Sequence, residues 1–292
     1  MMVLMVSGRT DVVAFYTEWF INRYEAGYLD VRNPFNPLLV SRINFSNVDM
    51  IMFCTKNPLP IIPYLSKIDK PMLFHVTLTG YKEDIEPNVI SKRKIIDGIK
   101  EISEIIGSEN VVVRYDPVFL NPKYTLDYHV KAFDHLCELL GGYVEKIIIS
   151  FLDNYKNVRK NSHFLNVIPF TNHDYLTIGK AFASSARKHG IAVQTCCEDI
   201  DLVEYGFVKD CCISKELALK MTGKNFPKWK SRDCNCVEVV DVGVYNSCQH
   251  FCKYCYANYD EKTVKFNFSQ HDSSSSLLVG HLNNDDIIKE RK

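Results

Sequence analysis

Three cysteines near the end of the chain are spaced to bind one metal centre. Cys248, Cys252 and Cys255 lie within eight residues, directly after a β-branched run at residues 237–242 that predicts a strand. A structural zinc site uses four protein ligands, and a cubane iron–sulfur cluster is normally held by four thiolates. A local set of three therefore implies a distant fourth ligand, such as another cysteine or His250, or a metal position left open for chemistry.

Six further cysteines form a second candidate metal site. They occur as the adjacent pairs 196–197 and 211–212 and as the close pair Cys234 and Cys236. Neighbouring side chains on a strand diverge, so we expect one cysteine of each adjacent pair to point into a given site, which leaves four ligands. Four thiolates suit an auxiliary [4Fe–4S] cluster or a structural zinc ion. Scattered core cysteines are the plain alternative.

Composition bounds the class of protein. The chain has 292 residues, 46% of them apolar, which suffices for one large domain or two smaller ones. Its 35 basic and 35 acidic residues give no global attraction to nucleic acid. No apolar run approaches the roughly 20 residues of a membrane span, and the first residues lack the features of a signal peptide. We therefore expect a cytoplasmic protein with no membrane partner, in which eleven cysteines indicate metal or redox chemistry rather than disulfides.

Strands and helices alternate along residues 1–258, which predicts βαβ units, a parallel sheet and a single α/β domain. Seven or eight repeats suit a TIM-type (β/α) barrel, whole or partial, although periodicity alone does not distinguish it from a doubly wound sheet. The cysteine-rich portion is residues 196–258. Residues 259–292 show no sustained period and are expected to be a tail, partly disordered or packed over the barrel. Strands are predicted at residues 3–6, 48–54, 72–78, 111–114, 146–151, 191–194 and 237–242, and helices at 12–25, 91–106, 126–140, 174–189 and 214–221.

Almost every predicted strand ends in polar residues, which favours the barrel. The carboxyl ends of barrel strands converge on the face that carries the active site, whereas an open sheet brings together only those near its switch point. Ionisable and polar groups at these ends are expected to line one cavity: Arg9, Asp11, Lys56, Asn57, His75, Arg114, Asp116, Asp153 and Glu198. Arg9, Asp11, Lys56, Arg114 and Asp116 are the candidate catalytic residues. Lys56 and Arg114 suit a carboxylate or phosphate. For each, a structural ion pair or capped turn is the plain alternative.

The cysteine loop resembles the signature of the radical S-adenosylmethionine superfamily. In that superfamily, three cysteines with this CxxxCxxC spacing bind a [4Fe–4S] cluster. The open iron binds the amino and carboxylate groups of S-adenosylmethionine. An aromatic residue just before the third cysteine packs near the adenine, and Tyr254 occupies that position here.

The resemblance extends over about residues 1–258. The wider chain is similar to a bacterial family of unknown function related to radical-SAM and photolyase-annotated proteins. The segments that carry this similarity are Ser7-Gly-Arg-Thr-Asp11, Arg32-Asn-Pro-Phe-Asn-Pro37, Thr55-Lys-Asn-Pro58, Arg114-Tyr-Asp-Pro117 and Cys252-Lys-Tyr-Cys-Tyr-Ala-Asn258.

The signature stands in an unusual place. It normally follows the first barrel strand, whereas here it follows the last. Circular permutation accounts for this, because the last strand of a closed barrel lies beside the first. Ser7-Gly-Arg-Thr-Asp11 would then occupy the place of the superfamily's Gly-Gly-Glu motif, which contacts the methionine amino group. The resemblance thus implies Ser7, Thr10, Asp11 and Tyr254 as cofactor-binding residues, and it predicts that residues 248–255 adjoin residues 7–11.

The resulting hypothesis is a radical-SAM-like iron–sulfur enzyme. A one-electron donor of the flavodoxin or ferredoxin type would reduce the cluster, and S-adenosylmethionine would be cleaved to a 5′-deoxyadenosyl radical that acts on an unknown substrate. At the second site the resemblance favours Cys196, Cys212, Cys234 and Cys236 as ligands of a second cluster or zinc. The alternatives are a metal-stabilised barrel that binds nucleic acid or a partner without radical chemistry, and a cluster used only for electron transfer.

Overall fold

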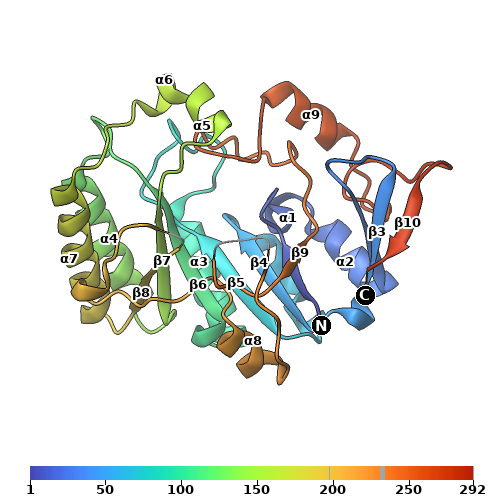
Figure 1. Ribbon diagram of the computed structural model, residues 1–292, viewed down its shortest axis with the longest axis horizontal. Helices are drawn as coiled ribbons and strands as arrows, with labels where there is room; N and C mark the ends of the chain where they lie inside the picture. The colour runs from blue at the N-terminus through green and yellow to red at the C-terminus, as the bar shows by residue number, and fades with distance from the viewer. Residues whose placement is uncertain (197, 231–233, 292) are drawn as a thin grey trace.

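The computed structural model of the chain describes residues 1–196, 198–230 and 234–291. At its centre lies a sheet of seven strands in the order β8-β7-β6-β5-β4-β1-β9, with every neighbouring pair parallel (Figure 1). The predicted α/β fold with a parallel sheet is confirmed. The strands are β1 (Val3–Val6), β4 (Met50–Thr55), β5 (Met72–Thr77), β6 (Val111–Val118), β7 (Lys146–Phe151), β8 (Ala192–Thr195) and β9 (Val239–Asp241).

The sheet is open, so the barrel that we expected, whole or partial, does not close. A barrel requires its first and last strands to pair, but β8 and β9 are the two edges of this sheet. The described residues between them contribute one helix and isolated bridges, including Gln194 with Val208, rather than strands that could close the gap. Alternation of strands and helices has the same sequence pattern in open and closed sheets, which is why the sequence did not separate them.

One face of the sheet carries most of the helices. From β1 to β8 the strands follow one another in a single direction, and right-handed crossovers then place the connecting helices on the same face. On α3, Ile95, Ile99 and Ile102 are buried against this face, because residues three and four apart share one side of a helix. The helices are α1 (Val12–Phe15), α2 (Thr17–Ala26), α3 (Lys92–Ile106), α4 (Leu126–Leu140) and α7 (Asn172–Lys188).

The helix expected over residues 12–25 is interrupted at Tyr16. This residue has a non-helical backbone, with φ of −138°, and separates α1 from α2. Its ring is buried, and its hydroxyl donates a hydrogen bond to the carbonyl of Ser247 at 2.6 Å. The break therefore directs Tyr16 toward the cysteine loop.

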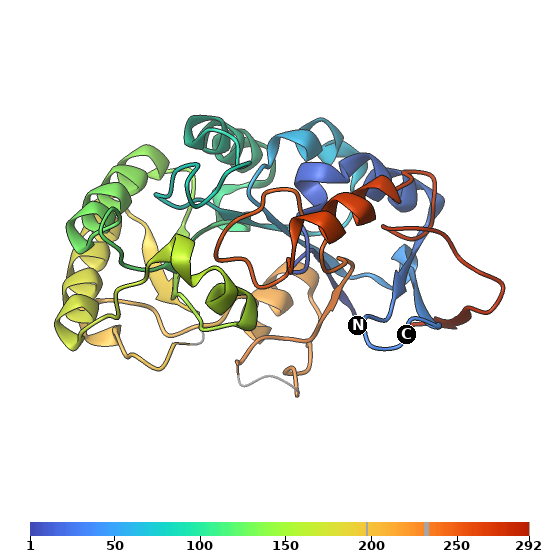
Figure 2. The ribbon, with the colours of Figure 1, turned by 90° about the horizontal axis from the view of Figure 1, so that it is seen from above.

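The other face of the sheet is covered by the segment that joins β8 to β9. This segment carries α8 (Lys215–Thr222), and residues such as Ile213, Phe226 and Val237 pack against Val3 and Met52 of the sheet. In Figure 2 the orange helix α8 of this segment lies apart from the green and yellow helices α4 and α7. The sheet thus has a helical layer on one face and a cysteine-rich cover on the other.

A smaller three-stranded sheet, ordered β10-β3-β2, stands beside the main one. Residues 259–291 contribute α9 (Glu261–Ser269) and β10 (Ile287–Glu290), and Trp19 donates to the carbonyl of Ser275 at 2.9 Å. None of the described helices is long and apolar enough to cross a membrane. The remaining elements are β2 (Tyr28–Arg32), β3 (Leu39–Asn44), α5 (Lys156–Lys160), α6 (Ser162–Leu165) and the 3-10 turns Phe45–Asn47, Leu59–Lys67, Ser108–Asn110 and Val203–Tyr205.

A buried histidine in the helical layer makes the fold sensitive to acid. His129 of α4 has no exposed surface; its Nδ1 lies 2.8 Å from the hydroxyl of Tyr115 and its Nε2 lies 2.9 Å from the carbonyl of Phe119. Because a carbonyl only accepts, Nε2 donates and the neutral ring satisfies both contacts. Burial lowers the pKa of His129 from 6.5 to about 4.

Acidification from pH 7 to pH 4 is expected to remove about 3 kcal/mol of unfolding free energy through His129. The unfolded chain takes up this proton below pH 6.5, whereas the folded chain resists it until about pH 4. Urea unfolding at stepped pH measures the loss. His129→Gln should flatten the profile over this range, whereas the exposed His135→Gln should leave its slope unchanged; equal slopes in all three proteins would contradict the assignment.

Candidate metal centre

The parallel pairing of β1 with β9 brings the first strand of the chain beside the strand that precedes the cysteine loop. Val3 is in register with Val239, and Met5 with Asp241. Beyond the strands, Ser7 donates to the carboxylate of Asp241 at 2.6 Å, and Tyr256 donates to the carbonyl of Gly8. Nε2 of His250 lies 2.8 Å from the carboxylate of Asp11, so the predicted adjacency of residues 248–255 and 7–11 is confirmed, although the barrel that suggested it does not close.

A glycine permits this close approach. A Cβ atom on Gly243 would overlap the hydroxyl of Ser7 and stand 3.1 Å from Oδ1 of Asp241. The backbone N–H of Gly243 donates to that same Oδ1 at 2.7 Å. The chain that leaves β9 is thus held against the N-terminal loop by contacts that leave no room for a side chain.

Gly243→Ala is expected to destabilise the protein by about 1–3 kcal/mol, because an overpacked site must move side chains or backbone. Gly141→Ala is the matched control, since its added Cβ meets nothing closer than 3.4 Å. Chemical denaturation of both variants measures the difference. Equal stabilities would show that the Ser7 loop moves freely away from β9.

Side-chain amides of asparagines hold the cysteine loop in place. The loop backbone is also anchored directly, since the N–H of Lys253 donates to the carbonyl of Ile85 at 2.9 Å. Four asparagine amides donate to carbonyls between residues 248 and 256. These bonds run from Asn88 to Gln249 (2.8 Å), Asn157 to Tyr256 (2.7 Å), Asn161 to Lys253 (2.7 Å) and Asn258 to Cys248 (2.7 Å).

The three thiols of this loop lie inward. Cys248 and Cys252 are buried, and Cys255 is half-buried. Burial is the main cause that raises the pKa of all three, to about 12 for Cys252. The backbone N–H of Ala257 already points at the sulfur of Cys255, at 3.3 Å. Such N–H···S bonds stabilise metal-bound thiolates and tune iron–sulfur clusters.

The donor atoms of the loop are of the kind that a four-iron cluster takes, since each thiolate of such a cluster binds a different iron atom. Among the described residues, no three or more His, Cys, Asp or Glu side chains are placed to hold a single metal ion. Two buried oxygens near the loop, Oγ1 of Thr10 and Oδ1 of Asn258, have no hydrogen-bond partner among the described residues. The donor set and these free acceptors fit a cluster carrying a polar ligand.

Asp11 holds the site together rather than standing free within it. Its Oδ1 accepts from the N–H of Ala14, which caps α1. Its Oδ2 accepts from the N–H of Lys56 at 2.7 Å and lies 2.8 Å from Nε2 of His250. The candidate cofactor residues 7–11 therefore differ in their availability: Ser7 and Asp11 are engaged within the chain, and Thr10 is the member with an unpaired side chain.

A glutamate that the sequence analysis did not identify, Glu86, links Tyr254 of the cysteine loop to Lys56, the residue after β4. Glu86 is buried, and its Oε1 accepts from Lys56 at 2.8 Å and from Tyr254, while its Oε2 accepts from Lys92. Burial by itself raises the pKa of Glu86, but the neighbouring cations outweigh it and lower this pKa to about 2. Two lysines around one glutamate leave a net positive charge beside Cys252.

Tyr254 is fixed by these groups. The Nζ of Lys56 lies 5.4 Å from the centre of the Tyr254 ring, and the Tyr81 ring lies 5.8 Å away. Tyr254 is buried within an apolar cluster that also contains Cys252 and Ile85. Its ring therefore anchors the cysteine loop to the segment after β5.

The remaining predicted residues separate into two groups. Arg9 lies at the cysteine loop, where it donates to the carbonyl of Asp241 at 2.6 Å. Arg114 and Asp116 pair with each other at 2.6 Å on the other face of the sheet, and Arg114 donates to the sulfur of Cys212 at 3.1 Å. The residues expected to line one cavity are thus divided between the cysteine loop and the second cysteine set.

The other predicted residues have separate surroundings. His75 is buried near Arg114, and Glu198 accepts a hydrogen bond from Ser150. Asn57 bonds locally to Thr55 and Leu59, and Asp153 is exposed.

The structure brings together part of the second cysteine set. The sulfurs of Cys196 and Cys212 are 3.1 Å apart. Cys236 lies within electrostatic range of Cys212. Cys234 is half-buried in the segment before β9, and Cys197 lies outside the described residues.

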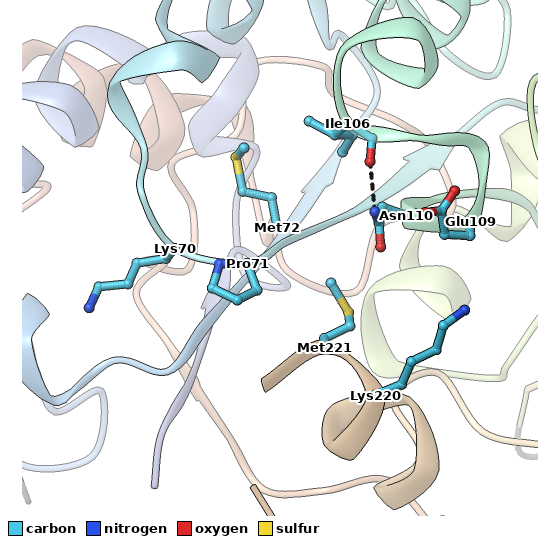
Figure 3. A pocket seen from close by; sticks show the side chains of 8 residues that line it. All are labelled: Lys70, Pro71, Met72, Ile106, Glu109, Asn110, Lys220 and Met221. Atoms are coloured by element: carbon cyan, nitrogen blue, oxygen red, sulfur yellow. Dashed lines mark hydrogen bonds between the residues drawn. The ribbon is translucent and has the colours of Figure 1, made fainter. Parts of the chain in front are cut away.

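A surface pocket of about 370 Å³ lies away from both cysteine sets (Figure 3). It is formed where the amino ends of β5 and β6 meet α8, with Met221 and Lys220 of α8 on one side and Met72 on the other. Open parallel sheets bind ligands beyond the carboxyl ends of their strands. We therefore assign the candidate site to the cysteine loop and not to this pocket.

These features define an α/β protein with a three-cysteine loop at the carboxyl edge of an open parallel sheet. The chain belongs to the family described as a domain of unknown function, DUF1848, which matches residues 3–257. Neither the curated proteins nor the solved structures contain a match. The family match includes both cysteine sets and all the strand ends discussed above.

Proposed function

We propose that the protein is a radical S-adenosylmethionine enzyme whose [4Fe–4S] cluster is held by Cys248, Cys252 and Cys255. The observation that carries this proposal is a set of three thiols at the carboxyl edge of the sheet, two of them buried and the half-buried third accepting a backbone N–H···S bond. His250, the fourth ligand that a zinc knuckle would use, is instead paired with Asp11 at 2.8 Å. Three protein ligands would leave one iron open.

When bound and reduced by a one-electron donor, the cluster with S-adenosylmethionine supplies a 5′-deoxyadenosyl radical that abstracts hydrogen from a substrate. The chain's own residues would position and shield this chemistry. Lys56 and Lys92 place cationic groups beside Cys252, where they favour the carboxylate of the cofactor. Thr10 offers an unpaired hydroxyl, and Tyr254 presents a ring held in one orientation by Glu86. Burial of the thiols excludes water from the cluster.

Anaerobic reconstitution with iron and sulfide tests the proposal. The expected product is a brown protein with about four iron atoms at this site, which cleaves S-adenosylmethionine to 5′-deoxyadenosine once a strong reductant is added. A colourless protein that takes up only zinc would refute it. A stable cluster that never yields 5′-deoxyadenosine would replace it with an electron-transfer function.

A further inference from the structure

Exposed aromatic residues gather where α5 and α6 meet the end of the cysteine loop. Tyr256 and Tyr259 follow the third cysteine, Tyr155 directly precedes α5, and Phe164 lies on α6. Each of these four residues is between 45% and 52% exposed, and residues 167–168 after α6 add an exposed valine and isoleucine. The rings of Tyr155 and Tyr256 lie 5.5 Å apart, so the two segments form one surface. Exposed apolar side chains that gather in this way mark interaction sites.

Helices α5 and α6 are fixed to the cysteine loop. Val158 of α5 and Leu165 of α6 are buried in the same apolar cluster as Cys252. The Nζ of Lys160 donates to the carbonyl of Tyr259 at 2.8 Å, in addition to the asparagine bonds described above. A molecule that binds to these helices would therefore be held at a constant position relative to the cysteines.

This surface also carries positive charge. Residues 154–168 contain no acidic residue, and the three lysines and arginines among them are all exposed. Lys253 lies between the second and third cysteines, and its Nζ is 4.8 Å from the centre of the Phe164 ring. Since the whole chain has no net charge, this is a local excess of positive charge. The basic residues of α5 are Lys156, Arg159 and Lys160.

An acidic protein fits this surface better than a nucleic acid does. A groove for single-stranded nucleic acid is positively charged along the path of the strand. Here the exposed Asp153 stands two positions before Tyr155, and the exposed Asp260 directly follows Tyr259. Aromatic residues and arginine are enriched in protein interfaces. Weak complexes between redox proteins bury less than about 1,200 Å², so a small surface suffices for them.

We propose that the surface formed by α5, α6 and residues 253–259 is the docking surface for an acidic protein that donates one electron to the cluster. This inference rests on the proposed function. In the transfer, the donor is oxidised by one electron and the cluster is reduced by one, and no covalent bond forms or breaks. Lys253 directly follows Cys252 in the chain, and Tyr256 directly follows Cys255, so an electron that enters here has only the loop to cross. Opposite charges would speed association and orient the donor.

Charge reversal on α5 tests the docking surface. Lys156→Glu/Arg159→Glu changes two exposed residues that lie outside the cofactor-binding set. Binding of a purified acidic flavodoxin to the reconstituted protein is expected to weaken about tenfold or more at low ionic strength, and salt should reduce the difference by screening. The matched control is Lys188→Glu/Lys215→Glu, which makes the same charge change at exposed positions of α7 and α8 and should bind flavodoxin within about twofold of the wild type.

Phe164→Ala tests the apolar part of the surface. Its loss of flavodoxin affinity is expected to persist at high salt, because the substitution removes apolar contact area rather than charge. Calorimetric titration with flavodoxin at two salt concentrations measures both effects. Equal flavodoxin affinities in the wild type, Phe164→Ala and the charge-reversal variant would overturn the inference. So would failure of the wild type to bind either flavodoxin or an acidic ferredoxin at low ionic strength.

Two reductants separate this inference from the proposed function. With dithionite, which needs no docking, Lys156→Glu/Arg159→Glu should bind its full cluster and form 5′-deoxyadenosine at the wild-type rate. With limiting reduced flavodoxin, its rate should fall by about the factor by which its binding weakens. If dithionite yields no 5′-deoxyadenosine from the wild type, the proposed function fails, while weaker flavodoxin binding by the charge-reversal variant would still support the docking surface. Loss of single-stranded oligonucleotide binding, with flavodoxin binding unchanged, would assign the surface to nucleic acid and overturn the inference.

Discussion

Cys252→Ala is expected to abolish both cluster binding and cleavage of S-adenosylmethionine. Cys252 is the central ligand of the proposed set, and its sulfur lies beside the Lys56–Glu86 pair. Loss of one of three protein ligands leaves two, which cannot retain a cluster against release into solution. The effect should exceed the roughly 10- to 100-fold losses that follow changes outside the ligand shell. Iron and sulfide content and 5′-deoxyadenosine formation after reconstitution measure it.

The matched control is Cys137→Ala. Cys137 is buried in α4 within the main core, where burial raises its pKa to about 12, and it has no contact with the cysteine loop. This substitution removes a core sulfur and should cost some stability, yet leave cluster content and activity at the wild-type level. A Cys252→Ala protein that keeps its full cluster would place the iron elsewhere in the chain and refute the proposed site.

The sequence predicted those parts of the fold that depend on local pattern. The strands near residues 50, 74, 113 and 148 are apolar runs of strand length, and they occupy the centre of the sheet. The adjacency of residues 3–6 and 239–241 was also predicted, because the position of the signature required the last strand to lie beside the first. Closure was not predictable, since it depends on whether the segment after β8 forms further strands.

The site was predicted only where its residues follow a strand or a motif. Lys56 and Asp11 stand at strand ends, which is why they were identified. Glu86 lies in the turn region between β5 and α3, where no period or motif marks it, and its role depends on lysines 30 positions before it and 6 after it.

Glu86→Gln is expected to cost about 3–5 kcal/mol of unfolding free energy, the range for breaking a buried ion pair by removing one partner. The amide keeps the size of the side chain but no longer neutralises Lys56 and Lys92. Lys56 is the more strongly affected, because its side chain is only 13% exposed and cannot easily reach water, whereas that of Lys92 is 32% exposed. Tyr254 and Thr79 would then donate to a neutral oxygen instead of a carboxylate.

Two measurements separate the consequences of Glu86→Gln. Urea unfolding gives the stability loss, and the exposed Glu101→Gln on α3 is the matched control, expected to change stability by less than about 0.5 kcal/mol. Reconstitution of the folded fraction gives cluster content, which should fall because Glu86 anchors Tyr254 next to Cys255. A variant as stable as Glu101→Gln would mean that both lysines already reach solvent. Lost stability with full cluster content would show that Glu86 supports the fold and that the asparagine contacts alone hold the cysteine loop.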